Sequence, residues 1–166
     1  KTLVLRNYLE SINCDSALLT SYPAVFYFSG FTSEDAYLFV TKNEQYIVTD
    51  SRYFLQAKSE SNDFQLISGS CADFKYLKPL IKKENISSIA FEDLHFTVSA
   101  FKSLKESIEI EDLIPLNNKI TDIRRCKSGD EVEKITKALK LAEYALNKTV
   151  LQISAGMTEV QVAAIL

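Results

Sequence analysis

Apolar residues recur with two different spacings along the first two thirds of the chain. Over 2–12 and 97–107 they return every three or four positions, which predicts helices with one apolar face. The same interpretation applies to 72–85, although Pro79 lies inside that segment and favours a kink or a break. Short runs rich in β-branched and aromatic residues are typical of strands and lie at 17–20, 37–40, 46–49, 64–67, 88–91 and 108–114.

Two of these strand segments are separated only by the polar turn 41–45, which predicts an antiparallel hairpin. The other strands are separated by predicted helices, and this alternation is typical of an α/β fold. Together the hairpin and the helical connections predict a three-layer sandwich in which a mixed β-sheet is flanked by helices. We also expect Asp50 to cap a helix over 51–61, because a carboxylate in front of a helix accepts hydrogen bonds from its free N–H groups.

No strand pattern appears after Asn117. The segments 128–131 and 158–161 have the form Ser/Thr-x-x-Glu/Gln of a capping box, which predicts a helix start at each. Apolar residues recur at helical spacing between them, and Gly156 suits the end of the first of these helices. The second helix has little to pack against before the chain ends, so we expect the 166 residues to be a fragment of a longer protein. We divide the chain into a domain at 1–118 and, at 119–166, a linker and the start of a second domain.

Composition narrows the functional classes. Hydrophobic residues make up 46% and charged residues 25%, as in ordinary globular proteins, and the net charge of −3 offers no basic surface for nucleic acid. We expect neither a membrane span nor a signal peptide, because no apolar run has the required length. The three cysteines are dispersed and odd in number, which favours reduced thiols in a cytoplasmic protein.

The residues that usually perform catalysis are scarce. With one histidine and four glycines, the chain lacks the material for a His-rich zinc site, a Ser-His-Asp triad or a glycine-rich phosphate loop. His95 follows Glu92 and Asp93 at a spacing that matches no ligand signature, and we interpret the three as polar loop residues. The acidic residues of 109–112 are interpreted as a solvated strand edge, and Cys126 as part of a basic linker. We predict no catalytic and no metal-binding residue in the chain.

Two local segments carry more specific signals. The segment 27–31 is either a turn built on Gly30 or an exposed loop that, with 32–35, presents Phe31 and two carboxylates to a partner. Beyond the predicted hairpin, Arg52 either forms a structural ion pair with Asp50 or holds a carboxylate in a bidentate contact.

These segments and several others resemble motifs of Xaa-Pro aminopeptidases and prolidases, in the same order. The resemblance covers essentially the whole chain and rests on Tyr27-x-x-Gly30-Phe31, Leu38-x-Val40-Thr41, Thr49-Asp50-x-Arg52-Tyr53-x-x-Gln56-Ala57, Phe91-Glu92, Leu113-Ile114-Pro115-Leu116, Ile123-Arg124-x-x-Lys127-Ser128-x-x-Glu131 and Gly156-Met157-Thr158-Glu159. It implies a creatinase/prolidase N-terminal domain, followed by the first helices of a truncated pita-bread metallopeptidase domain.

The resemblance also implies a function for the parent protein. Members hydrolyse the bond between an N-terminal residue and a following proline, at two divalent metal ions (manganese or cobalt) held by Asp, Asp, His, Glu and Glu of the pita-bread domain. Those ligands lie downstream of the matched motifs, so we expect this fragment to hold no metal and to be inactive. In relatives the N-terminal domain mediates homodimer formation and caps the partner's active site over the Xaa-Pro peptide. The residues implied here are Phe31, Thr32, Ser33, Glu34, Asp35, Arg52 and Tyr53.

Two other functional classes stay open. The same pair of domains occurs in binding modules that have lost catalysis, such as the large subunit of the FACT histone chaperone. The third interpretation is an independent α/β domain with its own small-molecule site. Metal ligands beyond Leu166 would separate the enzyme from the binding module. Small departures from the family pattern, such as Gly129 where many relatives have proline, touch no charged position.

Overall fold

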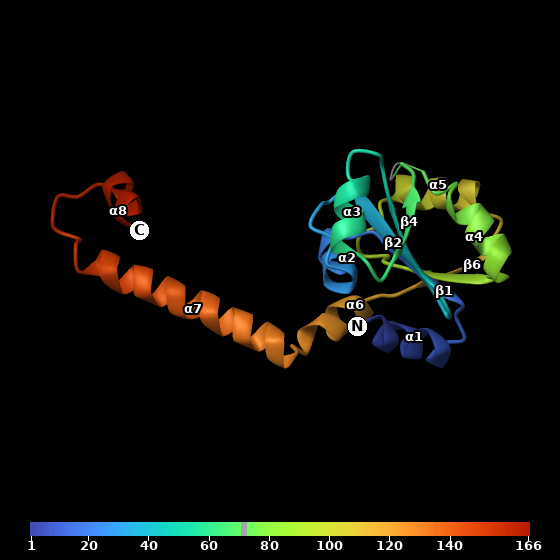
Figure 1. Cartoon of the computed structure of the whole chain (residues 1–166), viewed down its shortest axis with the longest axis horizontal. Coiled ribbons are helices and arrows are strands. Elements are labelled where there is room, and N and C mark those ends of the chain that lie inside the picture. Colours follow the sequence, from blue (N-terminus) through green and yellow to red (C-terminus); the bar gives the residue numbers. More distant parts are fainter. Residues whose placement is uncertain (71–72) are drawn as a thin grey trace. The chain divides into compact units, whose positions relative to one another are not determined.

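Six short strands form one sheet within the first of two compact units, Lys1–Arg124 and Arg125–Leu166. The computed structural model describes residues 1–70 and 73–166 (Figure 1). The strands are β1 (Ser16–Leu19), β2 (Ala36–Thr41), β3 (Gln45–Thr49), β4 (Gln65–Ser68), β5 (Ser88–Phe91) and β6 (Asp112–Pro115). The helices are α1 (Thr2–Ser11), α2 (Tyr22–Ser29), α3 (Phe54–Glu60), α4 (Leu77–Glu84), α5 (Val98–Ser107), α6 (Lys119–Arg125), α7 (Gly129–Val150) and α8 (Glu159–Ile165).

The sheet has the strand order β4-β3-β2-β1-β5-β6. Strand β2 pairs antiparallel with both β1 and β3, whereas β1 with β5, β5 with β6, and β3 with β4 pair in parallel. Five strands therefore run in one direction and β2 alone runs against them. The predicted hairpin is β2–β3, and the predicted mixed sheet is confirmed.

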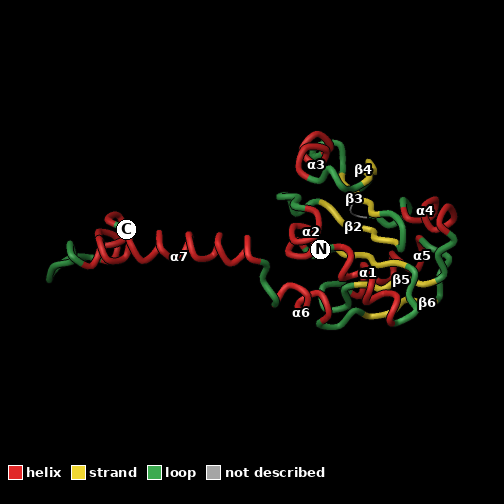
Figure 2. The backbone as a smooth tube through the Cα atoms, turned by 60° about the horizontal axis from the view of Figure 1, so that its bottom comes forward, coloured by secondary structure: helices red, strands yellow, loops and turns green. Residues whose placement is uncertain are grey.

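Both faces of the sheet are apolar, because alternate residues of each strand point to opposite sides. Along β2, Leu38 and Val40 belong to a cluster with α1, α2, α3 and α6, while Tyr37 and Phe39 belong to a second cluster with α4 and α5. Figure 2 shows α4 and α5 on the opposite side of the strands from α2. The three-layer α/β sandwich is therefore confirmed.

Helix α2 has no counterpart in the sequence prediction. Its eight residues are almost all apolar, so no helical period separates one face from the other. The signals lie at its ends: the Ser21 hydroxyl accepts a hydrogen bond from a first-turn N–H, Pro23 lies in the first turn, and Gly30 ends the helix at φ 80°. Of the two interpretations of 27–31, the turn built on Gly30 describes this helix end.

Helix α3 begins later than the sequence suggested. It starts at Phe54 with Tyr53 as its N-cap residue, so the expectation that Asp50 caps a helix from position 51 is wrong. Asp50 Oδ1 instead accepts a hydrogen bond from Arg52 N at 2.9 Å, which closes a turn before the helix. Aspartate caps turns and helices by the same short-range hydrogen bond, and the sequence alone does not separate the two.

Two further elements are shorter than predicted. Helix α4 begins at Leu77, so Pro79 falls in its first turn, where the missing N–H removes no helical hydrogen bond. Residues 71–72, which include the expected start of this helix, lie outside the described residues. Strand β6 begins at Asp112, because Ile108 and Ile110 are buried in the loop before it and do not pair with β5.

The second unit is helical, as predicted. Both capping boxes form, at 128–131 in front of α7 and at 158–161 in front of α8. Helix α7 ends at Val150, so the expectation that Gly156 is its C-cap is wrong; Gly156 adopts φ 93° in the turn before α8. In the described part of the chain, no helix combines the length and the apolar character needed to cross a bilayer.

Candidate functional site

The two segments singled out in the sequence lie at the same edge of the sheet. Strands β1 and β3 run in one direction, so their last residues lie at one edge, and the antiparallel β2 begins there, with Ala36 paired to Thr49. The loop 31–35, which leads into β2, therefore meets residues 50–53, which follow β3. We call these two segments the edge loops.

Arg52 joins the edge loops through its guanidinium group. Its Nη2 donates to Asp50 Oδ2 at 2.6 Å and to Asp35 Oδ2 at 3.1 Å. The hydrogen bond from Arg52 is the main reason that the pKa of Asp50 lies below its ordinary value, and Asp50 in turn raises the pKa of Arg52. The Arg52 side chain is 66% exposed. The carboxylates that Arg52 holds thus belong to its own chain, and the cation is fixed yet open to solvent.

The other end of the first edge loop is held by α3. Glu60 Oε2 accepts a hydrogen bond from Thr32 N at 2.9 Å, and Gln56 Nε2 donates to the Thr32 hydroxyl at 2.8 Å. The backbone hydrogen bond from Thr32 is the main reason that the pKa of Glu60 lies below its ordinary value. Because Thr32 is tied to α3 and Asp35 to Arg52, the residues between them are presented on a loop with two fixed ends.

Phe31 is not presented to solvent, contrary to the expectation for this loop. Its side chain is fully buried in the cluster that α1, α2 and α3 form over the sheet. The ring lies edge-on to the Tyr53 ring with centroids 6.4 Å apart. The Arg52 guanidinium lies over the other ring, with its Cζ 5.1 Å from the Tyr53 centroid. Transfer of a phenyl ring from water to the core lowers the free energy, so the ring is buried and anchors the loop to the core. Thr32 and Glu34 remain exposed.

A buried carboxylate lies at the same edge of the sheet. Glu92, which is 3% exposed, follows β5 and accepts hydrogen bonds from Thr20 N at 2.7 Å, Ser21 N at 2.9 Å and the Ser21 hydroxyl at 2.7 Å. These donors directly precede α2, so the carboxylate occupies the positive end of that helix. The sequence places Glu92 in a loop and in the Phe91-Glu92 motif but does not reveal this contact, because its partners are 71 and 72 positions away along the chain.

Asp93 and His95 do not join the hydrogen-bond network of the Glu92 carboxylate at the start of α2. Asp93 Oδ1 accepts a hydrogen bond from Asn117 N at 2.7 Å, and His95 is exposed. Within residues 1–70 and 73–166, no three His, Cys, Asp or Glu side chains are grouped so that they could hold a metal ion.

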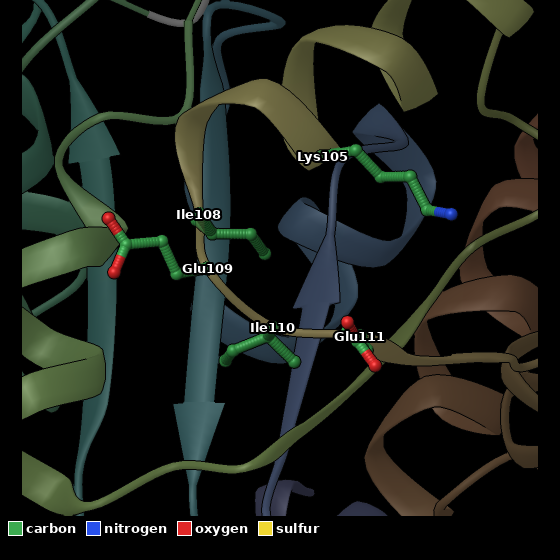
Figure 3. Close-up of a pocket in the computed structure, with 5 residues that line it drawn as sticks. All are labelled: Lys105, Ile108, Glu109, Ile110 and Glu111. Atoms are coloured by element: carbon green, nitrogen blue, oxygen red, sulfur yellow. The ribbon is translucent and has the colours of Figure 1, made fainter.

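A cavity of about 540 Å³ lies where α5 leads into β6, at the opposite edge of the sheet, and is lined by Lys105, Ile108, Glu109, Ile110 and Glu111 (Figure 3). The two carboxylates extend in opposite directions, and the ammonium group of Lys105 points away from Glu109. Glu109 pairs with Lys78 at 2.6 Å, and this hydrogen bond is the main reason that its pKa lies below its ordinary value. The charged groups of these five lining residues point apart and do not converge, so the edge loops are the better candidate site.

Comparison with known proteins matches the chain to one family. The family described as the Creatinase/Prolidase N-terminal domain matches residues 3–126. Among curated proteins, the uncharacterized peptidase YqhT of Bacillus subtilis and the Xaa-Pro dipeptidase of Pyrococcus horikoshii are each 26% identical over 159 residues. Among solved structures, the X-Pro aminopeptidase from Thermotoga maritima is similar with a TM-score of 0.85 at 29% identity, over 99% of this chain and 47% of that chain.

The alignments end well inside the relatives. They cover 96% and 95% of this chain but only 45% and 43% of the Bacillus and Pyrococcus proteins. The chain therefore spans about half the length of the curated relatives it matches.

Proposed function

The chain belongs to the creatinase/prolidase N-terminal domain family, and on this basis we propose that it is the non-catalytic N-terminal domain, with the first helices of the catalytic domain, of an Xaa-Pro aminopeptidase or dipeptidase. The parent enzyme hydrolyses the peptide bond that precedes proline. The observation that carries the proposal is the family match over 3–126, which the similarity to a solved aminopeptidase extends to 99% of the chain. In this assignment 1–118 is the creatinase-like domain, and 119–166 is the linker and the start of a pita-bread domain.

The parent reaction depends on two divalent metal ions, manganese or cobalt, which supply an activated hydroxide and polarise the scissile carbonyl. The described residues of this chain do not fit such a site, because they bring no three potential ligands together. We therefore assign the metals to the remainder of the parent protein and assign no catalytic step to residues of this chain.

The contribution we propose for this chain is homodimer formation and capping of the partner's active site by Thr32–Asp35, Arg52 and Tyr53. Two features support it: the loop is fixed at Thr32 and Asp35 by hydrogen bonds, and Glu34 between them is exposed. A loop that is already ordered excludes long peptides without losing further conformational entropy on closure. Phe31 takes no part in the contact and supports the loop from the core.

We place the parent protein in the cytoplasm. Cys14 and Cys126 are free thiols, which is typical of proteins in a reducing compartment.

The capping role is tested by Arg52→Ala in the full-length enzyme. The ion pairs of Arg52 are exposed, and exposed ion pairs contribute little to stability. We therefore expect their loss to lower the melting temperature only slightly. Releasing Asp35 loosens the loop, so we expect a several-fold fall in turnover, or a several-fold smaller preference for short over long Xaa-Pro peptides. The measurement is kcat/KM for a series of Xaa-Pro peptides of increasing length.

The matched control is Lys78→Ala, which removes another exposed ion pair, with Glu109, at the opposite edge of the sheet. It should leave peptide-length selectivity unchanged. A large drop in melting temperature for Arg52→Ala with unchanged kinetics would show that Arg52 is purely structural.

The division of labour within the parent enzyme has its own test. The 166-residue chain, supplied with manganese, should release no N-terminal residue from an Xaa-Pro peptide above a protein-free blank. Release above the blank would refute the assignment of catalysis to the rest of the parent protein.

A further inference from the structure

A second cavity opens at the carboxyl ends of β1 and β5, next to the edge loops. It has a volume of about 250 Å³, and its lining includes Thr20, Glu34, Phe74, His95, Phe96 and Thr97. We call it the edge groove. Cavities that hold drug-sized ligands are larger, from about 300 Å³ upward, so the edge groove has room for one side chain and not for a nucleotide.

The position of the edge groove in the topology is the one where open α/β sheets bind ligands. After β1 the chain packs α2 on one face of the sheet before it enters β2, and after β5 it packs α5 on the other face before it enters β6. The neighbouring strands β1 and β5 therefore diverge in their connections and leave a crevice at their carboxyl ends. Thr20 follows β1, and His95 lies in the loop after β5.

Such a crevice usually binds an anion through N–H groups and hydroxyls at the helix starts. Here these groups already form hydrogen bonds within the chain. Glu92 binds the N–H groups in front of α2, and the Thr97 hydroxyl accepts a hydrogen bond from Ala100 N at 3.1 Å at the start of α5. The Glu34 carboxylate lines the edge groove and would repel an anion.

The remaining lining suits a cation. Across residues 1–70 and 73–166, the Glu34 carboxylate has no hydrogen-bond or ion-pair partner, and the described lining contains no lysine or arginine. Phe74 and Phe96 lie stacked with centroids 5.8 Å apart. Aromatic faces carry negative charge density, so they attract a cation and the aliphatic stem that carries it.

We propose that the edge groove binds the lysine or arginine side chain of a peptide, with Glu34 as the counter-ion and the aromatic rings against the aliphatic stem. The choice of a peptide as its source rests on the proposed function, because Glu34 belongs to the loop assigned to substrate capping. The edge groove is then a subsite for a basic residue of the substrate.

The single histidine provides a direct readout. Its ring protons give signals that need no assignment, because His95 is the only histidine in the sequence. The 166-residue chain is titrated with acetyl-Ala-Pro-Arg-amide and with acetyl-Ala-Pro-citrulline-amide, two peptides of nearly equal shape that differ by one positive charge. We expect the arginine peptide to shift the His95 signals with a millimolar dissociation constant, about fivefold below that of the citrulline peptide.

Two variants test which carboxylate of the chain pairs with the positive charge of the arginine peptide. Glu34→Gln should raise the dissociation constant of the arginine peptide to that of the citrulline peptide, while Glu109→Gln, a carboxylate at the opposite edge, should leave it unchanged. Glu34 is exposed, so its variant keeps the fold, as an otherwise unaltered spectrum would show. Equal binding of the two peptides, or an unchanged constant in Glu34→Gln, would overturn the proposal.

A last arm tests the source of the side chain. Acetyl-arginine-amide should bind several-fold more weakly than the peptide; equal binding would overturn the assignment to a peptide and leave a site for free amines. None of these measurements needs a second subunit or a metal. Failure of the capping role would appear in the peptide-length kinetics of the parent enzyme and would leave the His95 titration unaffected.

Discussion

The same amphipathic spacing gives a buried apolar face in the first unit and an exposed one in the second. Leu104 of α5 has no exposed surface and packs in the cluster with β2. Leu139 of α7 is 56% exposed, and the residues that continue its period are about equally exposed, namely Val132, Ile135 and Leu146. Periodicity decides which face of a helix is apolar, whereas tertiary contacts decide whether that face stabilises the chain.

The largest expected effect is a difference in stability between two variants, in which a buried leucine of α5 and an exposed leucine of α7 are each replaced by alanine. Leu104→Ala removes a fully buried side chain and should lower the free energy of unfolding of the first unit by about 2–5 kcal/mol. Leu139→Ala should change it by no more than about 0.5 kcal/mol, because leucine and alanine have similar helix propensities and little contact is lost. Urea unfolding followed by near-UV circular dichroism measures this, since seven of the eight tyrosines precede Arg124.

Equal losses in the two variants would contradict the comparison, because they would mean that the face of α7 is buried by contacts in the isolated chain. Leu141→Ala, on another exposed residue of α7, serves as the control for the cost of truncation alone.

The four inner strands were the most predictable part of the fold, because they are buried on both faces. In β2, which is buried at every position from Ala36 to Thr41, every residue except the final threonine is apolar or aromatic, so the pattern is visible locally. Helix α2 is equally apolar, and a short apolar run does not distinguish a buried helix from a buried strand. Its cap residues Ser21 and Gly30 were the informative signal, and they lie outside the apolar run.

A second prediction compares a long-range helix cap with a local one. Glu92→Ala leaves the N–H groups of Thr20 and Ser21 and the Ser21 hydroxyl without their acceptor in a buried site, which should cost about 2–3 kcal/mol. Glu131→Ala removes the matching carboxylate of the exposed capping box of α7 and should cost about 0.5–1 kcal/mol. Urea unfolding measures the first, and helical circular dichroism at 222 nm follows the second. Similar costs would show that water replaces Glu92 at the start of α2.

The candidate site was predictable only where its contacts are short in sequence. Arg52 and Asp50 are two positions apart, and their ion pair is one of the two alternatives that the local sequence suggests. The hydrogen bonds that fix the loop ends, from Arg52 to Asp35 and from Thr32 to Glu60, span 17 and 28 positions and depend on the pairing of β2 with β3. Phe31 was misplaced for the same reason, because the core that attracts its ring is assembled from several distant elements.

A third prediction concerns pH. Partial burial alone would raise the pKa of Asp15, but hydrogen bonds from Lys42 and Ser87 outweigh this and hold it well below its ordinary value. A carboxyl whose pKa is lowered by folding stabilises the protein above its unfolded pKa, near 4, and loses that contribution as the pH falls towards the folded pKa. Asp15→Asn should therefore destabilise the first unit at pH 6 by about 1 kcal/mol, since solvent screens the exposed Lys42, and by a smaller amount at pH 2.

Unfolding of both proteins at pH 6, 4 and 2 checks this. Glu133→Gln, which removes the exposed pair with Lys137 on α7, is the control and should show no such pH dependence. A difference between wild type and Asp15→Asn that stays constant with pH would mean that the carboxyl acts through shape and not through charge.

The smallest expected effect lies at the start of α7, at a glycine whose backbone position suits proline. Gly129 is the first helical residue, and a Cβ built there meets nothing within 4 Å. Ser128 before it has φ −70° and ψ 165°, the extended conformation that a residue preceding proline requires. Gly129→Pro should therefore stabilise the start of α7 by about 0.5 kcal/mol, because it restricts the unfolded chain and removes no helical hydrogen bond. Helical circular dichroism on heating measures it. The contrasting change Gly156→Ala places a side chain at φ 93° and should destabilise the turn before α8, so a loss in both variants would show that Gly129 requires glycine as Gly156 does.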